Sequence, residues 1–175
     1  MAEKPLPGAG ALLDDLLLYR LSRLLAVGGS PVIRLCEGRF GITRREWRVL
    51  ATLVEHGGQG LGSSRLAEVA QLDRARTSRA VGSLTAKGLI SRSHLGGDRR
   101  QVMLCLTDAG RAIHDQLFPL VQEINAQLMA VLTPQAARAF DESLARLQAQ
   151  AEALLPAAAH LPKADRRRRA ALCAC

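Results

Sequence analysis

Aromatic side chains are scarce in this 175-residue chain, which has one Trp, one Tyr and three Phe. Long apolar segments are missing too, since no apolar run approaches the roughly 18 residues that a membrane-spanning helix needs. The amino terminus lacks a basic segment followed by a hydrophobic signal core. We therefore expect a cytoplasmic protein that neither spans a membrane nor is secreted.

Cysteine and histidine are present in numbers too small, and at spacings too irregular, for a metal site. The four cysteines show no spacing typical of a zinc site or a small disulfide scaffold, and free thiols are expected in a reducing compartment. The four histidines are scattered, with no nucleophile or carboxylate at an informative spacing. A glycine-rich phosphate loop is also missing. We expect no enzyme activity, no catalytic residue, no metal site and no cofactor.

Positive charge, by contrast, is in excess, with a formal net charge of +8. Residues 64–100 hold eight Lys or Arg against three Asp or Glu, and residues 157–175 hold five against one. Residues 101–156 are net acidic, with three against six. This distribution favours a phosphate-rich partner over an acidic small substrate.

Two short helices joined by a tight turn are predicted between Ser63 and Gly88. Ser63 is expected to cap a short apolar helix that ends before Gln71. Asp73 is expected to cap a second helix, which runs to Lys87 and stops at Gly88, a residue that tolerates the left-handed conformation common at helix ends. This arrangement is a helix-turn-helix, whose second helix can enter the major groove of DNA.

The second helix divides into a buried and an exposed face. Thr77, Val81 and Leu84 recur at spacings of four and three and form the buried stripe. Arginines and serines occupy the other positions, and arginine matches both phosphate oxygens and the edge of guanine. The DNA-binding residues predicted from the two helices are Ser63, Ser64, Arg65, Arg74, Arg76, Ser78, Arg79 and Ser83.

A hairpin with a basic tip follows the second helix. Residues 89–95 and 101–106 are predicted strands, and the intervening residues 96–100 contain two glycines that permit a tight turn. Arg99 and Arg100 lie at this tip, where they can reach the minor groove, and Asp98 is expected to hold one of these arginines in place. The hairpin is therefore predicted to be a wing, and these three residues complete the predicted DNA-binding set.

These segments resemble the MarR family of bacterial transcription regulators. The resemblance rests on Leu66-Ala67, on residues 73–84, on Lys87-Gly88-Leu89-Ile90, and on Asp98-Arg99-Arg100 followed by Leu106-Thr107-Asp108-Ala109-Gly110. The wing signature of the family, Asp-x-Arg followed by Leu-Thr, is met by Asp98, Arg100, Leu106 and Thr107. The similarity extends upstream through Phe40-Gly41-Ile42-Thr43 and Trp47 to Leu50, and it covers roughly residues 12–155.

Long helices with apolar faces flank the predicted DNA-binding lobe. One covers residues 12–27 and is broken by Gly28-Gly29, after which Ser30-Pro31 restarts the helix as cap and first residue. Thr43 and Glu46 form a predicted capping box at the start of the next helix. After the wing, Thr107 is expected to cap a long helix that Pro119 bends, with an apolar stripe that continues to Val131. A last helix begins at Thr133-Pro134 and carries an apolar seam from Ala137 to Leu154.

A single small domain cannot cover so much apolar helix surface, so we expect the terminal helices to pair with those of a second copy, as the resemblance also implies. The expected fold is mostly α with a small β-hairpin wing. It is a winged helix-turn-helix domain over residues 11–155, with a DNA-binding lobe at about 43–107 and dimerisation helices at about 11–40 and 108–155. Residues 157–175 are predicted to be a basic disordered tail.

The resemblance further implies a pocket between the dimer helices and the winged domain, often for an aromatic acid or phenol. An arginine beside an aromatic ring suits a planar carboxylate, through an ion pair and stacking. The candidate ligand-binding residues are Tyr19, Arg23, Arg34, Trp47 and Arg48. In the alternative interpretation, both aromatic side chains belong to the core and the arginines reach solvent.

The expected function is that of a nucleoid-associated homodimeric repressor, released from a pseudo-palindromic double-stranded DNA operator by a small aromatic acid or related metabolite. Two alternatives stay open. Some regulators of the family sense oxidants through a cysteine, and Cys36 is the candidate here, although nothing nearby indicates a lowered pKa. The other is a winged-helix architectural or protein-assembly module without an effector.

Overall fold

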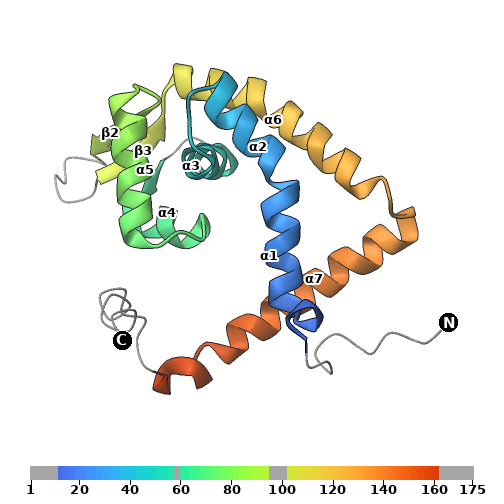
Figure 1. Cartoon of the computed structure of the whole chain (residues 1–175). Helices are drawn as coiled ribbons and strands as arrows, with labels where there is room; N and C mark the ends of the chain where they lie inside the picture. Colours follow the sequence, from blue (N-terminus) through green and yellow to red (C-terminus); the bar gives the residue numbers. More distant parts are fainter. Residues whose placement is uncertain (1–11, 57–59, 95–101, 162–175) are drawn as a thin grey trace, which may run out of the picture. The chain divides into compact units, whose positions relative to one another are not determined.

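The computed structural model describes residues 12–56, 60–94 and 102–161 (Figure 1). The chain divides into two compact units, one ending at Leu128 and the other beginning at Met129. The first unit contains the helix-turn-helix segment and the sheet, and the second contains the last long helix. No helix within the described ranges is long and apolar enough to cross a membrane.

The amino-terminal part of the first unit is almost continuously helical. It consists of a 3-10 turn, η1 (Leu13–Asp15), two α-helices, α1 (Leu17–Gly28) and α2 (Ser30–Arg34), and a π-helical turn, η2 (Leu35–Arg39). The break at the paired glycines is confirmed, but the predicted cap is wrong by one residue. Gly29 is the cap, and Ser30 is already the first helical residue, so the pause in the helix is a single residue long.

Helix α3 (Arg44–Glu55) begins with the predicted capping box. The backbone N–H of Thr43 donates to the Glu46 carboxylate at 2.5 Å, and the Glu46 N–H donates to the Thr43 hydroxyl at 3.2 Å. Trp47, Leu50 and Leu53 are buried. The helix therefore enters the middle of the core with a firmly held amino-terminal end.

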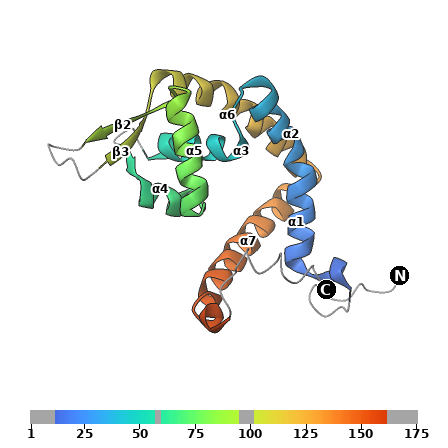
Figure 2. The ribbon, with the colours of Figure 1, turned by 60° about the vertical axis from the view of Figure 1, so that its left-hand side comes forward.

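The helix-turn-helix consists of α4 (Ser63–Val69) and α5 (Arg74–Ala86), which pack against each other and against α3 (Figure 2). The predicted cap at Ser63 is wrong, because Gly62 is the cap residue and Ser63 is the first helical residue, without a capping hydrogen bond. The Asp73 cap is confirmed, since its carboxylate accepts from the Arg76 N–H at 2.7 Å. The stop is confirmed too, with Gly88 at φ +69°.

The sheet has three short antiparallel strands in the order β1-β3-β2. Strands β2 (Ile90–His94) and β3 (Val102–Leu106) form the predicted hairpin, with Ile90 opposite Leu106. Strand β1 (Leu61–Gly62) was not predicted, because two residues are too few for a periodic signal. The wing tip, including Asp98, Arg99 and Arg100, lies outside the described residues.

Helix α6 (Asp108–Met129) runs through Pro119 without ending, as predicted. Thr107 caps it, with the hydroxyl accepting from the Gly110 N–H at 3.1 Å and donating to the Gly88 carbonyl at 2.7 Å. Leu117 is fully buried in the core of the first unit. The predicted stripe extends too far, because Val131 lies beyond the helix end and is 86% exposed.

The second unit contains α7 (Pro134–Leu154), capped by Thr133 as predicted. Its apolar seam is largely exposed in the single chain, with Phe140 at 41% and Leu147 at 42%. A short 3-10 helix, η3 (Ala157–His160), follows. The predicted tail from residue 157 therefore begins with helical backbone, which its three alanines favour. Residues 162–175 lie outside the described ranges.

Candidate nucleic-acid interface

Helix α5 presents one buried and one exposed face. Thr77, Val81 and Leu84 are at most 3% exposed and belong to the core side of the helix. Arg74, Ser78, Arg79 and Ser83 are exposed, and Arg76 is partly exposed. The structure thus places five of the predicted DNA-binding residues on the solvent side of one helix. Ser63, Ser64 and Arg65 are exposed in the first turn of the adjacent helix α4.

One flank of α5 borders a cavity of about 200 Å³. Residues of α5, the first two serines of α4 and Arg92 of strand β2 all line it. The lining residues are Ser63, Ser64, Arg74, Thr77, Ser78, Val81 and Arg92. Four predicted residues therefore come together on one flank.

Arg92 is a basic residue of this candidate interface that was not singled out from the sequence. It lies opposite Leu104 in the hairpin, on the same side of the sheet as Ile90 two positions earlier. The two-residue alternation of the strand could have placed it, because Ile90 is buried and marks the side that faces the helices.

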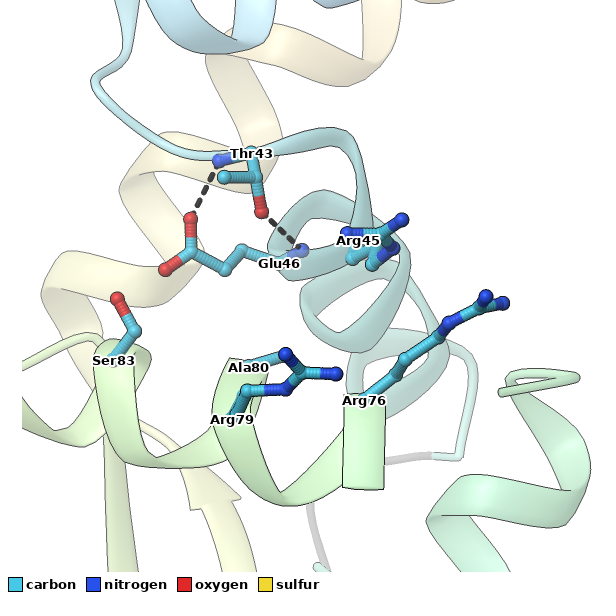
Figure 3. Close-up of a pocket in the computed structure, with 7 residues that line it drawn as sticks. All are labelled: Thr43, Arg45, Glu46, Arg76, Arg79, Ala80 and Ser83. Carbon is cyan, nitrogen blue, oxygen red and sulfur yellow. Dashed lines mark hydrogen bonds between the residues drawn. The ribbon is translucent and has the colours of Figure 1, made fainter. Parts of the chain in front are cut away.

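The opposite flank of α5 borders a second cavity, of about 190 Å³ (Figure 3). Its lining residues are Thr43, Arg45, Glu46, Arg76, Arg79, Ala80 and Ser83. Figure 3 shows Arg45 reaching from α3 to the same side as Arg76 and Arg79 of α5. Arg45 was likewise absent from the predicted set, because it precedes the helix-turn-helix in sequence and joins it only in three dimensions.

The arginines of this interface are partly held by local contacts. The Arg76 guanidinium lies 3.0 Å from the Asp73 carboxylate, and Arg79 Nε donates to the Ala75 carbonyl at 3.3 Å. Arg65 pairs with Glu68 at 2.8 Å. Exposed ion pairs of this kind contribute little to stability. Breaking them to bind another anion, such as phosphate, would therefore cost little free energy.

Glu46 is almost fully buried beneath this second flank and is linked to the end of α5. Lys87 Nζ lies 3.0 Å from both carboxylate oxygens of Glu46. Burial alone would raise the pKa of Glu46, but hydrogen bonds from Ser83, the Thr43 backbone and Lys87, with the Lys87 charge, lower this pKa overall. The carboxylate is thus charged and holds α3 against α5.

The five predicted ligand-binding residues lie in different parts of the first unit. Arg23, an exposed residue of α1, pairs with Asp14 of η1 at 2.9 Å and lies over the ring of the half-buried Tyr19 at 5.9 Å. Arg34 is exposed at the end of α2. Trp47 is only 8% exposed, and its ring stacks on His114 of α6 at 5.4 Å. The structure therefore does not bring Tyr19 and Trp47 into one aromatic platform.

Arg48 points away from this stack. Its Nη1 donates to the Ala70 carbonyl at 3.4 Å, next to the turn between α4 and α5.

The redox candidate, Cys36, is fully buried, and burial followed by the nearby charge of Glu37 raises the pKa of its thiol. A raised pKa disfavours the reactive thiolate form.

Comparison with known proteins agrees with this architecture. Residues 40–101 match the model of the MarR family. No curated protein matches the sequence closely enough to count as a relative. A probable transcriptional regulator from Pseudomonas aeruginosa has a similar structure, with a TM-score of 0.68 and 29% identity over 78% of this chain and 99% of that chain.

Two further solved structures are similar. A MarR-family transcriptional regulator from Silicibacter pomeroyi gives a TM-score of 0.66 and 28% identity over 79% of this chain and 92% of that one. The DNA binding of BpsR from Bordetella bronchiseptica is described as regulated by 6-hydroxynicotinic acid. Its structure gives a TM-score of 0.70 and 21% identity over 80% of this chain and 98% of that one, and an identity this low shows the fold alone. Residues 40–101 thus match the MarR family by sequence, and the chain has the winged-helix fold of the MarR-family transcriptional regulators.

Proposed function

We propose that this protein is a cytoplasmic, homodimeric transcriptional repressor that binds a pseudo-palindromic DNA operator through helix α5. The observation that carries the proposal is the basic cavity on each flank of this helix. On one side Arg74 and Arg92 gather, and on the other Arg45, Arg76 and Arg79.

The two flanks suit the two phosphate strands that border a major groove. The groove is about 12 Å wide and admits one α-helix, with a sugar–phosphate strand on either side. A helix lying in it needs cationic and hydroxyl groups on both flanks and small side chains along its ridge. Ala75 and Gly82 are exposed small residues on this ridge, beside Ser78 and Arg79, so the backbone can approach the bases closely. The flanking residues position the helix, and the ridge residues read the sequence.

Dimerisation is the second part of the proposal. Large apolar side chains are exposed on α1 and on α7, among them Leu18 at 78% and Phe140 at 41%. Contiguous exposed apolar surface marks a site of protein–protein contact. A symmetric pair would carry two copies of α5, and an operator with two half-sites about one helical turn apart would match them.

The effector in this proposal is a small aromatic acid or related metabolite. Support comes from BpsR, which shares the fold and whose DNA binding is described as regulated by 6-hydroxynicotinic acid. The burial and raised thiol pKa of Cys36 favour a ligand over oxidant sensing. Among the five candidate ligand residues, Arg23 already pairs with Asp14 and the Trp47 ring is stacked on His114, whereas Arg48 lines a cavity of the first unit.

The test is a footprint on DNA from the promoter region of the protein's own gene, with random-sequence DNA as competitor. We expect protection of a pseudo-palindrome. Arg79→Ala and Arg100→Ala should each weaken operator binding by about 1–3 kcal/mol per half-site. Arg39→Ala removes the same charge from outside both cavities and should leave affinity unchanged. Equal affinity for operator and random DNA would instead favour the architectural module.

The effector is tested on the same complex by titration with a panel of aromatic acids, in parallel with peroxide. Release by an acid, in both the native protein and the Cys36→Ser variant, is the expected result. Release by peroxide alone, abolished in Cys36→Ser, would show that oxidation is the signal.

A further inference from the structure

A third cavity of the first unit adjoins the flank cavity beside Arg79, because Thr43, Arg45 and Arg76 line both. Its volume is about 380 Å³, larger than that of either flank cavity. Elements from α2 to α5 contribute to it, and its lining residues are Ile33, Glu37, Thr43, Arg44, Arg45, Arg48, Gln71, Leu72 and Arg76.

The cavity is strongly cationic. Four of its nine lining residues are arginines, and Glu37 is the one acidic residue among them. Arg76 has its own partner in Asp73, at 3.0 Å. Arg44 and Arg45 form no ion pair within the parts of the chain that the structure describes. With Glu37 counted against Arg44, Arg45 and Arg48, two positive charges are left in excess.

The arginines are also crowded. Arg44 and Arg48 are one helical turn apart on α3, and Arg45 adjoins them. Partial burial, followed by the charges of Arg44 and Arg45, lowers the pKa of Arg48. Gathering like charges around a cavity costs free energy, which an anion of matching charge would recover.

The walls of the cavity suggest the body of the anion. Ile33 and Leu72 supply apolar surface, and Gln71 supplies an amide. A bare inorganic ion would not use these groups, whereas a carbon skeleton with two carboxylates would use them together with the arginine forks. We propose that this cavity is a binding site for a small dicarboxylate dianion, held by Arg44, Arg45 and Arg48.

The site would also regulate DNA binding, an inference that rests on the proposed function. Thr43, Arg45 and Arg76 line both this cavity and the flank cavity beside Arg79. A dianion behind these side chains would draw the two arginines away from DNA phosphate. Because binding free energies are reciprocal, operator DNA would weaken dicarboxylate binding by the same factor.

The first experiment measures direct binding without DNA. Terephthalate, an aromatic dicarboxylate, is titrated calorimetrically into the full-length protein, with benzoate and inorganic phosphate as controls at equal ionic strength. We expect saturable binding of terephthalate, at least about tenfold tighter than that of either control. Arg44→Gln and Arg48→Gln should each weaken it by about tenfold or more, whereas Arg39→Gln, outside the cavity, should not. Unfolding temperatures of all variants confirm that they are folded.

Several results would overturn the proposal. The first is that terephthalate does not bind. The second is that the native protein and Arg48→Gln bind terephthalate equally well. The third is that phosphate binds as tightly as terephthalate. Loss of DNA affinity in Arg44→Gln and Arg48→Gln, without any terephthalate binding, would assign the cavity to a DNA backbone phosphate instead.

The second experiment adds operator DNA. Terephthalate should lower operator affinity in the native protein and much less in Arg48→Gln, because that residue lines this cavity and not the flank cavities. An equal effect on both proteins would be ionic screening and would overturn the regulatory part. A protein that binds terephthalate but no operator would refute the proposed function and leave the dicarboxylate site standing.

Discussion

Lys87 Nζ lies 3.0 Å from both carboxylate oxygens of Glu46 and 2.8 Å from the carbonyl oxygen of Gly41. The two charged residues are 41 positions apart in the sequence. The contact joins the end of α5 to the start of α3. Because the Glu46 side chain is only 3% exposed, its partners are the chief compensation for its burial.

Replacing Lys87 by Met should destabilise the protein by about 2 kcal/mol, because the buried carboxylate loses a charged hydrogen-bond donor. The free energy of unfolding in urea measures this change. Arg65→Met removes an exposed pair instead and should cost at most about 1 kcal/mol. Equal costs for the two substitutions would show that the Lys87 contact is no more than a surface pair.

The same pair predicts a dependence of stability on pH. The pKa of Glu46 is lowered in the folded protein from its ordinary value of 4.5. Its contribution is therefore fully present above pH 4.5 and is lost as the pH falls through the lower folded pKa. Glu46→Gln should flatten this part of the stability curve, as measured by urea unfolding at a series of pH values. A curve as steep as that of the native protein would assign the acid sensitivity to other carboxylates.

Arg92→Gln tests the first flank cavity. If Arg92 neutralises one phosphate, the plot of log affinity against log salt concentration should become shallower by about one unit per subunit. Fluorescence anisotropy with a labelled operator at several salt concentrations gives this slope. Arg39→Gln is the matched control with an unchanged slope. An unaltered slope in Arg92→Gln would place Arg92 outside the interface.

Trp47→Ala should cost about 3–5 kcal/mol of stability, because the ring is buried and stacks on His114. Trp47→Phe should cost much less and, if the ring only packs, should keep the response to aromatic acids. Thermal unfolding and effector titration of the two variants are the measurements. If a stable Trp47→Phe protein no longer responded to aromatic acids, Trp47 would instead belong to the ligand-binding site.

Phe140→Asp with Leu147→Asp should convert the proposed dimer to a folded monomer, because both side chains lie on the exposed apolar seam of α7. Ala149→Asp, on the opposite side of this helix, should leave the mass unchanged. Sedimentation at several protein concentrations measures the mass. A double variant with the mass of the native protein would show that the seam does not pair subunits.

Local features of the chain were readable from the sequence because their signals lie within a few residues. The Thr43–Glu46 capping box, the Asp73 cap, the stop at Gly88 and the buried stripe from Thr77 to Leu84 are all confirmed. Capping and helical periodicity act over three or four positions, so tertiary packing did not override them. The family resemblance drew on the same segments, and the match over residues 40–101 confirms it.

Relationships between distant segments were decided by the tertiary structure. Gly62, and not Ser63, is the cap residue of α4 because strand β1 ends there. That strand exists only by pairing with β3. Arg45 and Arg92 line the cavities of the candidate interface because packing brings α3 and β2 beside α5. Trp47 could not be assigned from sequence, since a lone aromatic residue on an amphipathic helix suits a pocket or a core equally well. The His114 ring that covers it comes from α6, and only the folded chain brings the two together.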